Sequence, residues 1–261
     1  MRRIFTWLAA LGCFVLGTGC NLRSLDDPII VPDVEDEFYL GLWETLTPQG
    51  RFLEFRLRTI DDVECSNSVI AYDIRQVQGT ISLSINEIQQ NGECAPGQAP
   101  ATAAPKVGIL QGGYYSVEVG LRKSVASQGQ LVVTSEAYNL SLENGGGVVL
   151  LDPQLRRIPP ESVWGYVSYE SGDMKDVAEQ LVQDILGLCE PQSLKNGNYG
   201  YFTIQNGKAQ LPNSVAPDGA LSFQYHLVES DDALAGLLND YRSQYGNQIE
   251  VKVFDTFGMV Y

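Results

Sequence analysis

The sequence predicts a mainly β protein in which an antiparallel β-sandwich precedes a smaller α+β domain. Apolar and polar residues alternate with period two in the convincing segments from about residue 38 to 158, and this pattern is typical of half-buried strands. Turn-forming pairs such as Asn91-Gly92 and Gly112-Gly113 separate those segments. Helical periodicity appears only beyond Pro160, between further strand-like segments. The predicted organisation is a signal peptide at 1–19, an acidic tether at 20–37, the sandwich at 38–158 and the α+β domain at 161–261.

The strands of the sandwich are predicted from alternation within short segments. In YYSVEVGLR, residues 114–122, Val117 and Val119 share one face, and TISLSINEI, residues 80–88, alternates in the same way. Several short strands with regular turns are typical of sandwiches and barrels. The run GGYYSVEVGLRKSVASQGQLVV, residues 112–133, resembles the immunoglobulin-like or fibronectin-like sandwiches of bacterial surface lipoproteins. This resemblance implies a fold and carries no catalytic residue.

The second domain combines strand-like and helix-like segments. The alternating segments are WGYVSY (164–169), NYGYFTIQ (198–205), LSFQYHLV (221–228) and IEVKVFD (249–255). The pair Asn206-Gly207 is a strong hairpin signal. Apolar residues at helical spacing predict helices over 174–189 and 230–246, the second beginning at Ser230 or Asp231. The order β-α-β-β-α-β resembles a ferredoxin-like unit, which implies helices on one face of a four-stranded antiparallel sheet.

Alternation assigns the strand residues of this domain to two faces. The face toward the helices is expected to contain Val163, Val167, Phe202, Ile204, Leu221, Phe223, Tyr225, Leu227, Val251 and Val253. The opposite face is expected to carry the candidate ligand-binding residues Trp164, Tyr166, Tyr199, Tyr201 and His226. Aromatic rings with polar tips can stack on a sugar or hold a peptide. The alternative, which we favour, is that this face is buried against the first domain, because large apolar surfaces are rarely left exposed.

The first residues of the chain have the layout of an export signal. Arg2 and Arg3 precede an apolar stretch at 4–16 that is too short to span a bilayer. Gly17-Thr18-Gly19 then lead to Cys20, and this junction resembles the lipobox of bacterial lipoproteins. The resemblance implies that Cys20 is the lipidation site, where acyl chains such as palmitate anchor the mature protein to the bilayer of the bacterial cell envelope, with the outer membrane as the expected location. The alternative is an ordinary secretory peptide that leaves Cys20 as a free thiol.

The remaining cysteines are compatible with an oxidising compartment. Cys65 in VECSNS and Cys94 in NGECAPG lie in similar polar, loop-like settings, so we predict that they form a disulfide. Two unpaired loop thiols are the alternative. Cys189 falls on the apolar stripe of the helix predicted at 174–189. We expect it to be a buried free thiol that behaves as a small hydrophobic residue.

Charge and motif content restrict the classes of function. The chain has 32 acidic and 17 basic residues and a net charge of −15, and such a surface repels nucleic acid. His226 is the single histidine of the sequence. The sequence contains no nucleophile elbow, zinc-binding spacing or phosphate-binding loop. We therefore expect no catalytic residue, no metal, no cofactor and no nucleic-acid partner.

These observations lead to three functional hypotheses. The favoured one is a membrane-anchored, exported lipoprotein that acts as a binding or assembly module for an extracytoplasmic macromolecule, with a protein or a glycan as the partner. The first alternative is a carbohydrate-binding accessory protein that stacks sugars on Trp164, Tyr166 and Tyr201. The second is a carboxylate-dependent hydrolase, because acidic residues are plentiful.

Overall fold

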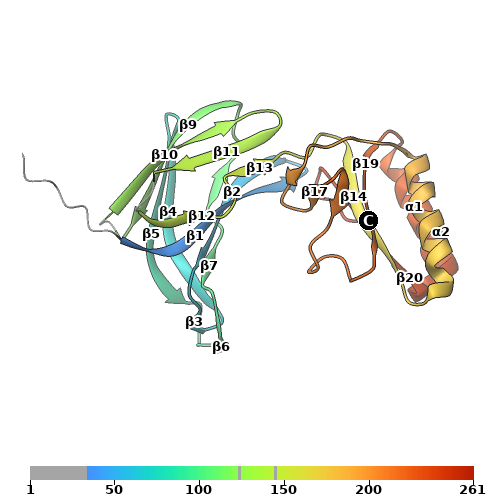
Figure 1. The fold of residues 1–261 in the computed structure, drawn as a ribbon, viewed down its shortest axis with the longest axis horizontal. Helices are drawn as coiled ribbons and strands as arrows, with labels where there is room; N and C mark the ends of the chain where they lie inside the picture. The colour runs from blue at the N-terminus through green and yellow to red at the C-terminus, as the bar shows by residue number, and fades with distance from the viewer. Residues whose placement is uncertain (1–33, 123–124, 144–145) are drawn as a thin grey trace, which may run out of the picture. The chain divides into compact units, whose positions relative to one another are not determined.

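A computed structural model describes residues 34–122, 125–143 and 146–261 (Figure 1). The residues from Val34 to Tyr261 form a compact unit of β-strands with the helices α1 (Lys175–Gly187) and α2 (Asp231–Tyr245). The predicted combination of a mainly β part with an α+β part is therefore confirmed. The lipidation site predicted at Cys20 lies outside the described residues. Within them, no helix is long and apolar enough to cross a membrane.

The first lobe, residues 34–158, is built around a large sheet. Its strands are β1 (Val34–Thr47), β2 (Gly50–Thr59), β4 (Ser68–Val77), β5 (Thr80–Gln90), β7 (Thr102–Ala103), β8 (Lys106–Gly108), β9 (Gly113–Leu121), β10 (Val125–Val133), β11 (Ala137–Leu142), β12 (Gly146–Leu150) and β13 (Gln154–Arg156). They pair in the order β12-β1-β2-β7-β4-β5-β9-β10-β11-β13, and β8 also pairs with β2. The sheet folds back on itself, because β12 passes so close to β10 that a Cβ on Gly146 would lie 1.6 Å from Ser127 Oγ.

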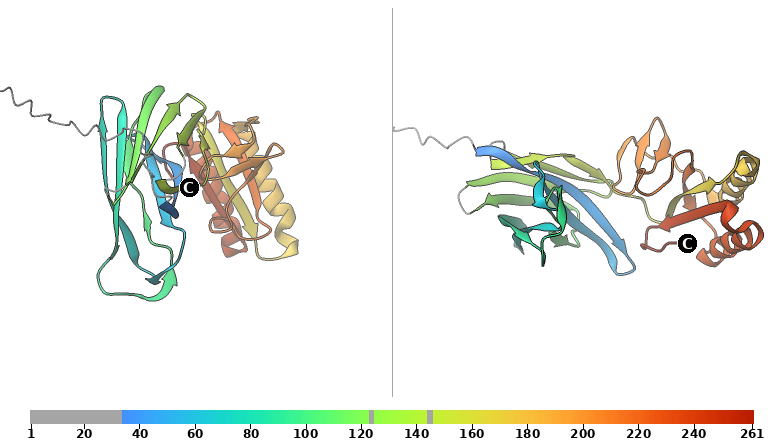
Figure 2. Two further views of the ribbon diagram at one scale, coloured as in Figure 1. Left: turned by 60° about the vertical axis from the view of Figure 1, so that its left-hand side comes forward. Right: turned by 90° about the horizontal axis from the view of Figure 1, so that it is seen from below.

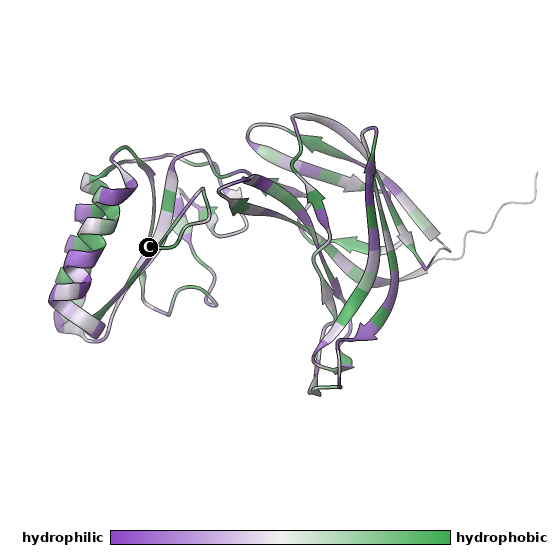
Figure 3. Cartoon of the chain, turned by 180° about the vertical axis from the view of Figure 1, so that it is seen from behind, coloured by the Kyte–Doolittle hydropathy of each residue, from purple (hydrophilic) through white to green (hydrophobic). Residues whose placement is uncertain are grey.

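Alternation along these strands places one face of the sheet in a common core. Apolar and polar residues alternate visibly along the strands in Figure 3. The buried residues of this core include Leu40 on β1, Phe55 on β2, Ile81 on β5, Val117 on β9 and Leu131 on β10. The shared face predicted for the segments at 80–88 and 114–122 is therefore confirmed.

The pairing departs from the expected antiparallel sandwich. β1 and β12 are parallel, and so are β5 and β9. Parallel neighbours need a crossover connection, and the stretch between β5 and β9 is long enough to supply one while also forming β6, β7 and β8. The expectation of a purely antiparallel sheet is wrong at these pairs. Alternation could not reveal this, because it reports which face a side chain occupies and not the direction of the neighbouring strand.

A disulfide joins Cys65 to Cys94, as predicted from their settings. Cys65 ends β3 (Val63–Cys65), which pairs with β6 (Pro96–Ala99) just after Cys94. The bond therefore closes a loop that contains β4 and β5 and joins the paired strands β3 and β6 at the Cys65 end.

The second lobe, residues 161–261, contains a sheet of β15 (Cys189–Glu190), β19 (Leu221–Leu227), β14 (Ser162–Tyr169) and β20 (Ile249–Asp255), paired antiparallel in that order. Both α1 and α2 cover one face of it (Figure 2). The short 3-10 helices η1 (Gly172–Met174) and η2 (Gly246–Gln248) adjoin them. Ser230 caps α2, since its hydroxyl accepts a hydrogen bond from the Ala233 amide at 3.2 Å. The core beneath the helices contains Val163, Val167, Phe223, Val251 and Val253, as expected.

The predicted second strand of this sheet is wrong in its location. The segment at 198–205 contributes to a separate small sheet of β16 (Gly197–Asn198), β17 (Thr203–Gln205) and β18 (Lys208–Gln210). Asn206 and Gly207 form the predicted hairpin turn, with φ of 52° and 75°. Phe202 and Ile204 consequently pack in another cluster, away from the helices.

Cys189 lies on β15 and not on the predicted helix, which ends at Gly187. The cysteine is nevertheless buried and free, as expected. Its strand is short, and Pro191 follows directly after Glu190.

Removing the disulfide in a Cys65→Ala/Cys94→Ala variant is expected to lower the free energy of unfolding by about 3.5 kcal/mol, because the bond closes a loop with a sequence separation of 29. Urea unfolding of the oxidised proteins measures the difference. A reducing agent should destabilise the wild type by a similar amount and leave the double variant unchanged. Equal stability of the two oxidised proteins would contradict the prediction.

Candidate functional site

The aromatic residues predicted as a ligand surface are mostly buried. Trp164 and Tyr166 are 1% exposed and Tyr199 is 5% exposed. The Trp164 ring lies 5.3 Å from that of Tyr201 and 5.6 Å from that of Phe202. Burial of Trp164, Tyr166 and Tyr199 leaves these three rings little surface on which a sugar or a peptide could stack, so the structure does not favour the predicted platform.

Trp164, Tyr199 and Tyr201 belong to a cluster that includes residues of the first lobe, in line with the alternative that the sequence favoured, whereas Tyr166 contacts Glu250 and Lys252 of β20. Leu46 of β1 and Ile158 pack in one cluster with Trp164. The Tyr201 hydroxyl accepts a hydrogen bond from the Leu46 amide at 3.2 Å, and its ring lies 4.9 Å from that of Trp43. The aromatic face therefore holds the two lobes against each other.

His226, the remaining predicted ligand-binding residue, lies away from this cluster on β19. Its Nε2 is 3.7 Å from a carboxylate oxygen of Glu161, and its buried Nδ1 has no hydrogen-bond partner within the described residues. The pair lines a pocket of about 550 Å³ that also contains Asp255. The Asp255 carboxylate is already engaged, because it accepts hydrogen bonds from the amides of Phe257 and Met259 at 2.8 Å each.

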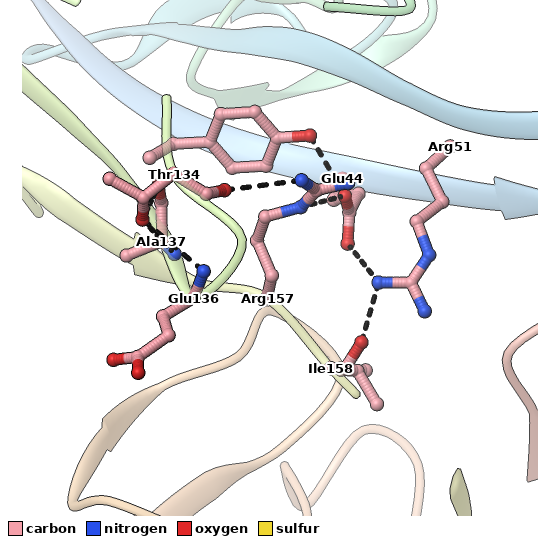
Figure 4. Close-up of polar contacts among 8 residues, drawn as sticks. Glu44, Arg51, Thr134, Glu136, Ala137, Arg157 and Ile158 are labelled. Atoms are coloured by element: carbon pink, nitrogen blue, oxygen red, sulfur yellow. Dashed lines mark hydrogen bonds and ion pairs between the residues drawn. The ribbon is translucent and has the colours of Figure 1, made fainter. Parts of the chain in front are cut away.

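A buried carboxylate that sequence reasoning missed lies at the junction of the lobes (Figure 4). Glu44 is 3% exposed. Its Oε1 accepts hydrogen bonds from Tyr138 Oη at 2.8 Å and from Arg157 Nε at 3.1 Å, and its Oε2 lies 3.5 Å from Arg51 Nη1. Arg51 also donates to the carbonyl of Ile158.

The charges of this cluster compensate one another. A buried carboxylate is tolerated when ion pairs and hydrogen bonds satisfy it. Burial lowers the pKa of Arg51, an effect that the negative charge of Glu44 opposes. Burial and the neighbouring Glu44 carboxylate raise the pKa of Tyr138. The only available sequence signal was an acid within the apolar series Phe38, Leu40, Leu42, Glu44, Leu46. Both oxygens of the Glu44 carboxylate are engaged by Tyr138, Arg157 and Arg51, so we interpret the cluster as structural.

An open groove of about 1000 Å³ lies between α1, the hairpin of β17 and β18, the following loop and β19. Most of its polar side chains are amides. Its polar lining comprises Asp176, Glu179, Gln180, Gln183, Gln192, Lys208, Gln210, Asn213, Asp218, Ser222 and Gln224. Three carboxylates and one ammonium group make the groove acidic on balance.

The edge of β19 forms one side of this groove, and the register defines which of its backbone groups are free. The Leu227 amide donates a hydrogen bond to the Glu161 carbonyl at 2.8 Å. This bond continues the antiparallel register in which Phe223 lies opposite Gly165. Hydrogen-bonded pairs alternate along such a ladder, so the odd-numbered residues of β19 bond to β14. The even-numbered residues direct their N–H and C=O groups away from β14.

The outward groups of β19 are paired at only one end of the strand within the described residues. His226 pairs with Glu190 of β15, and the Val228 amide donates to the Leu188 carbonyl at 3.2 Å. β15 then ends, so no strand in the described part of the chain is hydrogen-bonded to Ser222 and Gln224 on this side, although β18 also contacts β19. This is an open sheet edge.

Side-chain hydrogen bonds hold the end of the groove next to β15. Gln192 follows Pro191, and its Oε1 accepts hydrogen bonds from Ser162 Oγ at 2.9 Å and from Gln224 Nε2. The Gln224 side chain is thereby held by Gln192, while its backbone remains on the open edge. The groove thus presents backbone donors and acceptors in a fixed position, between walls that carry amides and acids.

Comparison of this chain with protein-family models, curated proteins and solved structures finds no match. The assignment of a functional site therefore depends on geometry and chemistry alone. Of the features described above, the groove is the one in which the backbone groups of a strand are left without a strand partner. Its chemistry is that of binding an extended polar chain.

A Glu44→Gln variant is expected to lose about 3–5 kcal/mol of stability, because Arg51 and Arg157 would lose their buried counter-charge. Urea unfolding measures this. The matched control is Tyr138→Phe, which keeps all three charges and removes one hydrogen bond, at a cost of about 1 kcal/mol. A Glu44→Gln variant no less stable than Tyr138→Phe would contradict the structural role.

The Cys189 thiol is expected to resist alkylation in the folded protein. Burial raises its pKa to about 11, so about one thiol in a thousand is ionised at pH 8. Because burial favours the neutral thiol, the folded state is stabilised relative to the unfolded state, whose thiol ionises at about pH 8.5. This contribution is fully present below about pH 8.5 and is lost as the pH rises through about 11. Iodoacetamide labelling followed by peptide mass spectrometry tests the reactivity, with protein unfolded in guanidinium as the positive control. Rapid native labelling of Cys189 at pH 8 would overturn the prediction.

Proposed function

We propose that this chain is an exported, lipid-anchored binding or assembly module that holds an extracytoplasmic macromolecule in the groove beside β19. The observation that carries the proposal is the open strand edge at Ser222 and Gln224, which lies inside a groove of about 1000 Å³. Unpaired strand edges are normally covered or blunted in natural proteins. An edge that is left open within a walled groove is suited to a ligand.

Export and anchoring are proposed from the sequence and supported by the disulfide. Arg2, Arg3 and the apolar stretch before Cys20 resemble a lipoprotein leader. The Cys65–Cys94 bond supports an oxidising compartment. We accordingly propose that the protein is anchored in the bacterial cell envelope, in the outer membrane, through acyl chains on Cys20. The tether predicted at 20–37 is shortened to 20–33, because β1 already begins at Val34.

We also propose that residues 161–261 are a ferredoxin-like unit with a shortened second strand. The strand order β20-β14-β19-β15 and the packing of both α1 and α2 on one face support this. The fold hosts many unrelated activities, so it assigns none. The immunoglobulin-like assignment of residues 38–158 stays a prediction, and the parallel pairs of β1 with β12 and of β5 with β9 do not favour it.

The alternative functions have less support. The carbohydrate-binding hypothesis loses its platform, because Trp164 and Tyr166 are buried. A glycan in the amide-lined groove remains an outcome that the experiment below can reveal. The carboxylate-dependent hydrolase stays a prediction.

Filling the groove is expected to abolish binding. The Gln183→Trp variant places an indole on the groove side of α1, where Gln183 is exposed and lines the groove. The matched control is Gln244→Trp, which makes the same exchange at an exposed position of α2 outside the lining. The full chain, purified in detergent, is applied to peptide and glycan arrays, and both variants are checked by thermal unfolding.

The expected result is a ligand whose binding is lost in Gln183→Trp and kept in Gln244→Trp. Ligands that bind equally well to both variants would place the binding surface elsewhere. If nothing on either array binds the wild type, the proposed function is wrong.

A further inference from the structure

We infer that the groove binds a partner protein by strand addition, in which an extended, basic segment of the partner pairs with the free edge of β19. The inference rests on the proposed function and specifies its ligand and its binding mode. It follows from the unused backbone groups of β19, from the walls of the groove and from the distribution of charge.

The backbone of β19 offers a ready set of hydrogen bonds. Ser222 and Gln224 each direct one N–H and one C=O group into the groove. Addition of a strand to an exposed sheet edge uses such groups for affinity. The same edge already carries one antiparallel pair, because His226 of β19 pairs with Glu190 of β15. An added strand would continue the position that β15 leaves after Glu190.

The walls restrict what can enter this position. α1 bounds the groove on the face of the sheet that carries Phe223, and the segment from Gly207 to Ala220 bounds it on the other side. A strand lies about 4.8 Å from its neighbour and needs only its own width beside β19. The recessed position therefore disfavours the edge-to-edge contact of two whole sheets, whereas a single added strand would occupy only the position that β15 leaves.

The charges of the walls select the chemistry of the partner. Asp176 and Glu179 on α1 and Asp218 in the loop are acidic, and Lys208 is the basic residue of the lining. Glu179 is also paired with Lys175 of α1 at 3.4 Å, so Asp176 and Asp218 contribute most of the excess negative charge. The whole chain is also strongly acidic, with a net charge of −15. A basic segment is attracted to such a groove and an acidic one is repelled. The acidic segment 20–33 of a second copy of this chain is disfavoured as the occupant for the same reason.

The two faces of the added strand would meet different surroundings. Side chains alternate between the faces of a sheet, so every second residue of the partner would point toward α1 and its carboxylates. The remaining residues would point toward Lys208 and Gln210 of the hairpin. The preferred sequence therefore has Lys or Arg at alternate positions and small polar residues between them.

Three synthetic peptides test the inference on the full chain in detergent. The first alternates Thr and Lys, the second alternates Thr and Glu, and the third is the Thr-Lys peptide with proline in place of alternate threonines. Strand addition predicts binding of the first peptide that weakens as salt is raised. It predicts at least tenfold weaker binding of the other two, because the second is repelled and the third lacks alternate N–H donors.

Amide hydrogen exchange of β19 gives the readout of the binding mode. The Thr-Lys peptide should slow exchange at the Ser222 and Gln224 amides, which face the groove. The Phe223 and Tyr225 amides bond to β14 and should be protected with and without peptide. Protection confined to other elements would overturn the inference.

A pair of variants at one position separates the backbone from the side chain. Ser222→Pro removes an outward N–H while the bonds of the odd-numbered residues to β14 stay in place. Ser222→Ala keeps the N–H and removes only the hydroxyl. We expect at least tenfold weaker peptide binding for the proline variant and a change of less than about twofold for the alanine variant. Protection of the Phe223 amide verifies that the sheet of the proline variant is intact.

The outcomes distinguish this inference from the proposed function. If the Thr-Lys peptide binds, and Gln183→Trp blocks it while a folded Ser222→Pro does not, the groove is a binding site but strand addition is wrong. If the arrays yield groove ligands while the Thr-Lys peptide fails to bind, the partner chemistry inferred here is wrong and the proposed function stands. If the Phe223 amide of the Ser222→Pro variant exchanges rapidly, the sheet of that variant is disrupted and its binding result is set aside. The test is then the wild type, in which the Thr-Lys peptide must slow exchange at the Ser222 and Gln224 amides.

Discussion

The buried carboxylate of Glu44 is the interaction on which the arrangement of the second lobe depends. It stands in the core register of β1 and is satisfied by Tyr138, Arg51 and Arg157. Arg157 belongs to the segment that leaves the first lobe, and Arg51 also binds the Ile158 carbonyl. Two prolines follow Ile158, and because proline has no N–H, this stretch cannot be held by a regular sheet ladder. The ion pairs and hydrogen bonds around Glu44 supply that attachment instead.

The fixed start of β14 explains why the aromatic face is buried. Ile158 packs with Leu46 and Trp164, so the face of the sheet opposite the helices begins next to the end of β1. The segment that contains Tyr199, Phe202 and Ile204 covers the rest of that face. This segment is the one that would otherwise have been free to extend beside β19. The burial of Trp164 and the open edge at Ser222 and Gln224 are therefore two consequences of the same chain path.

Local features of the fold were predictable from sequence because they depend on neighbouring residues. Alternation identified the core face of β5 and β9, Ser230 was placed as a helix cap, and Asn206-Gly207 was placed in a hairpin turn. The partners of strands were not predictable. NYGYFTIQ alternates in the same way whether it pairs with β19 or packs on Trp164, and the parallel pair of β1 with β12 joins segments distant in sequence. The groove was missed for the same reason, since it results from a strand that is absent from its expected place.

The length of the open edge also limits what it can do. An exposed edge that is long, flat and apolar promotes aggregation. The free part of β19 is bounded by the end of β15 and by the turn at Ala220, and its exposed residue Ser222 is polar. Acidic walls add a repulsive term against other acidic surfaces, including those of further copies of this chain. An edge of this kind can accept a complementary segment without starting an open-ended array, and this is the property expected of a binding module and not of an assembly that grows by repetition.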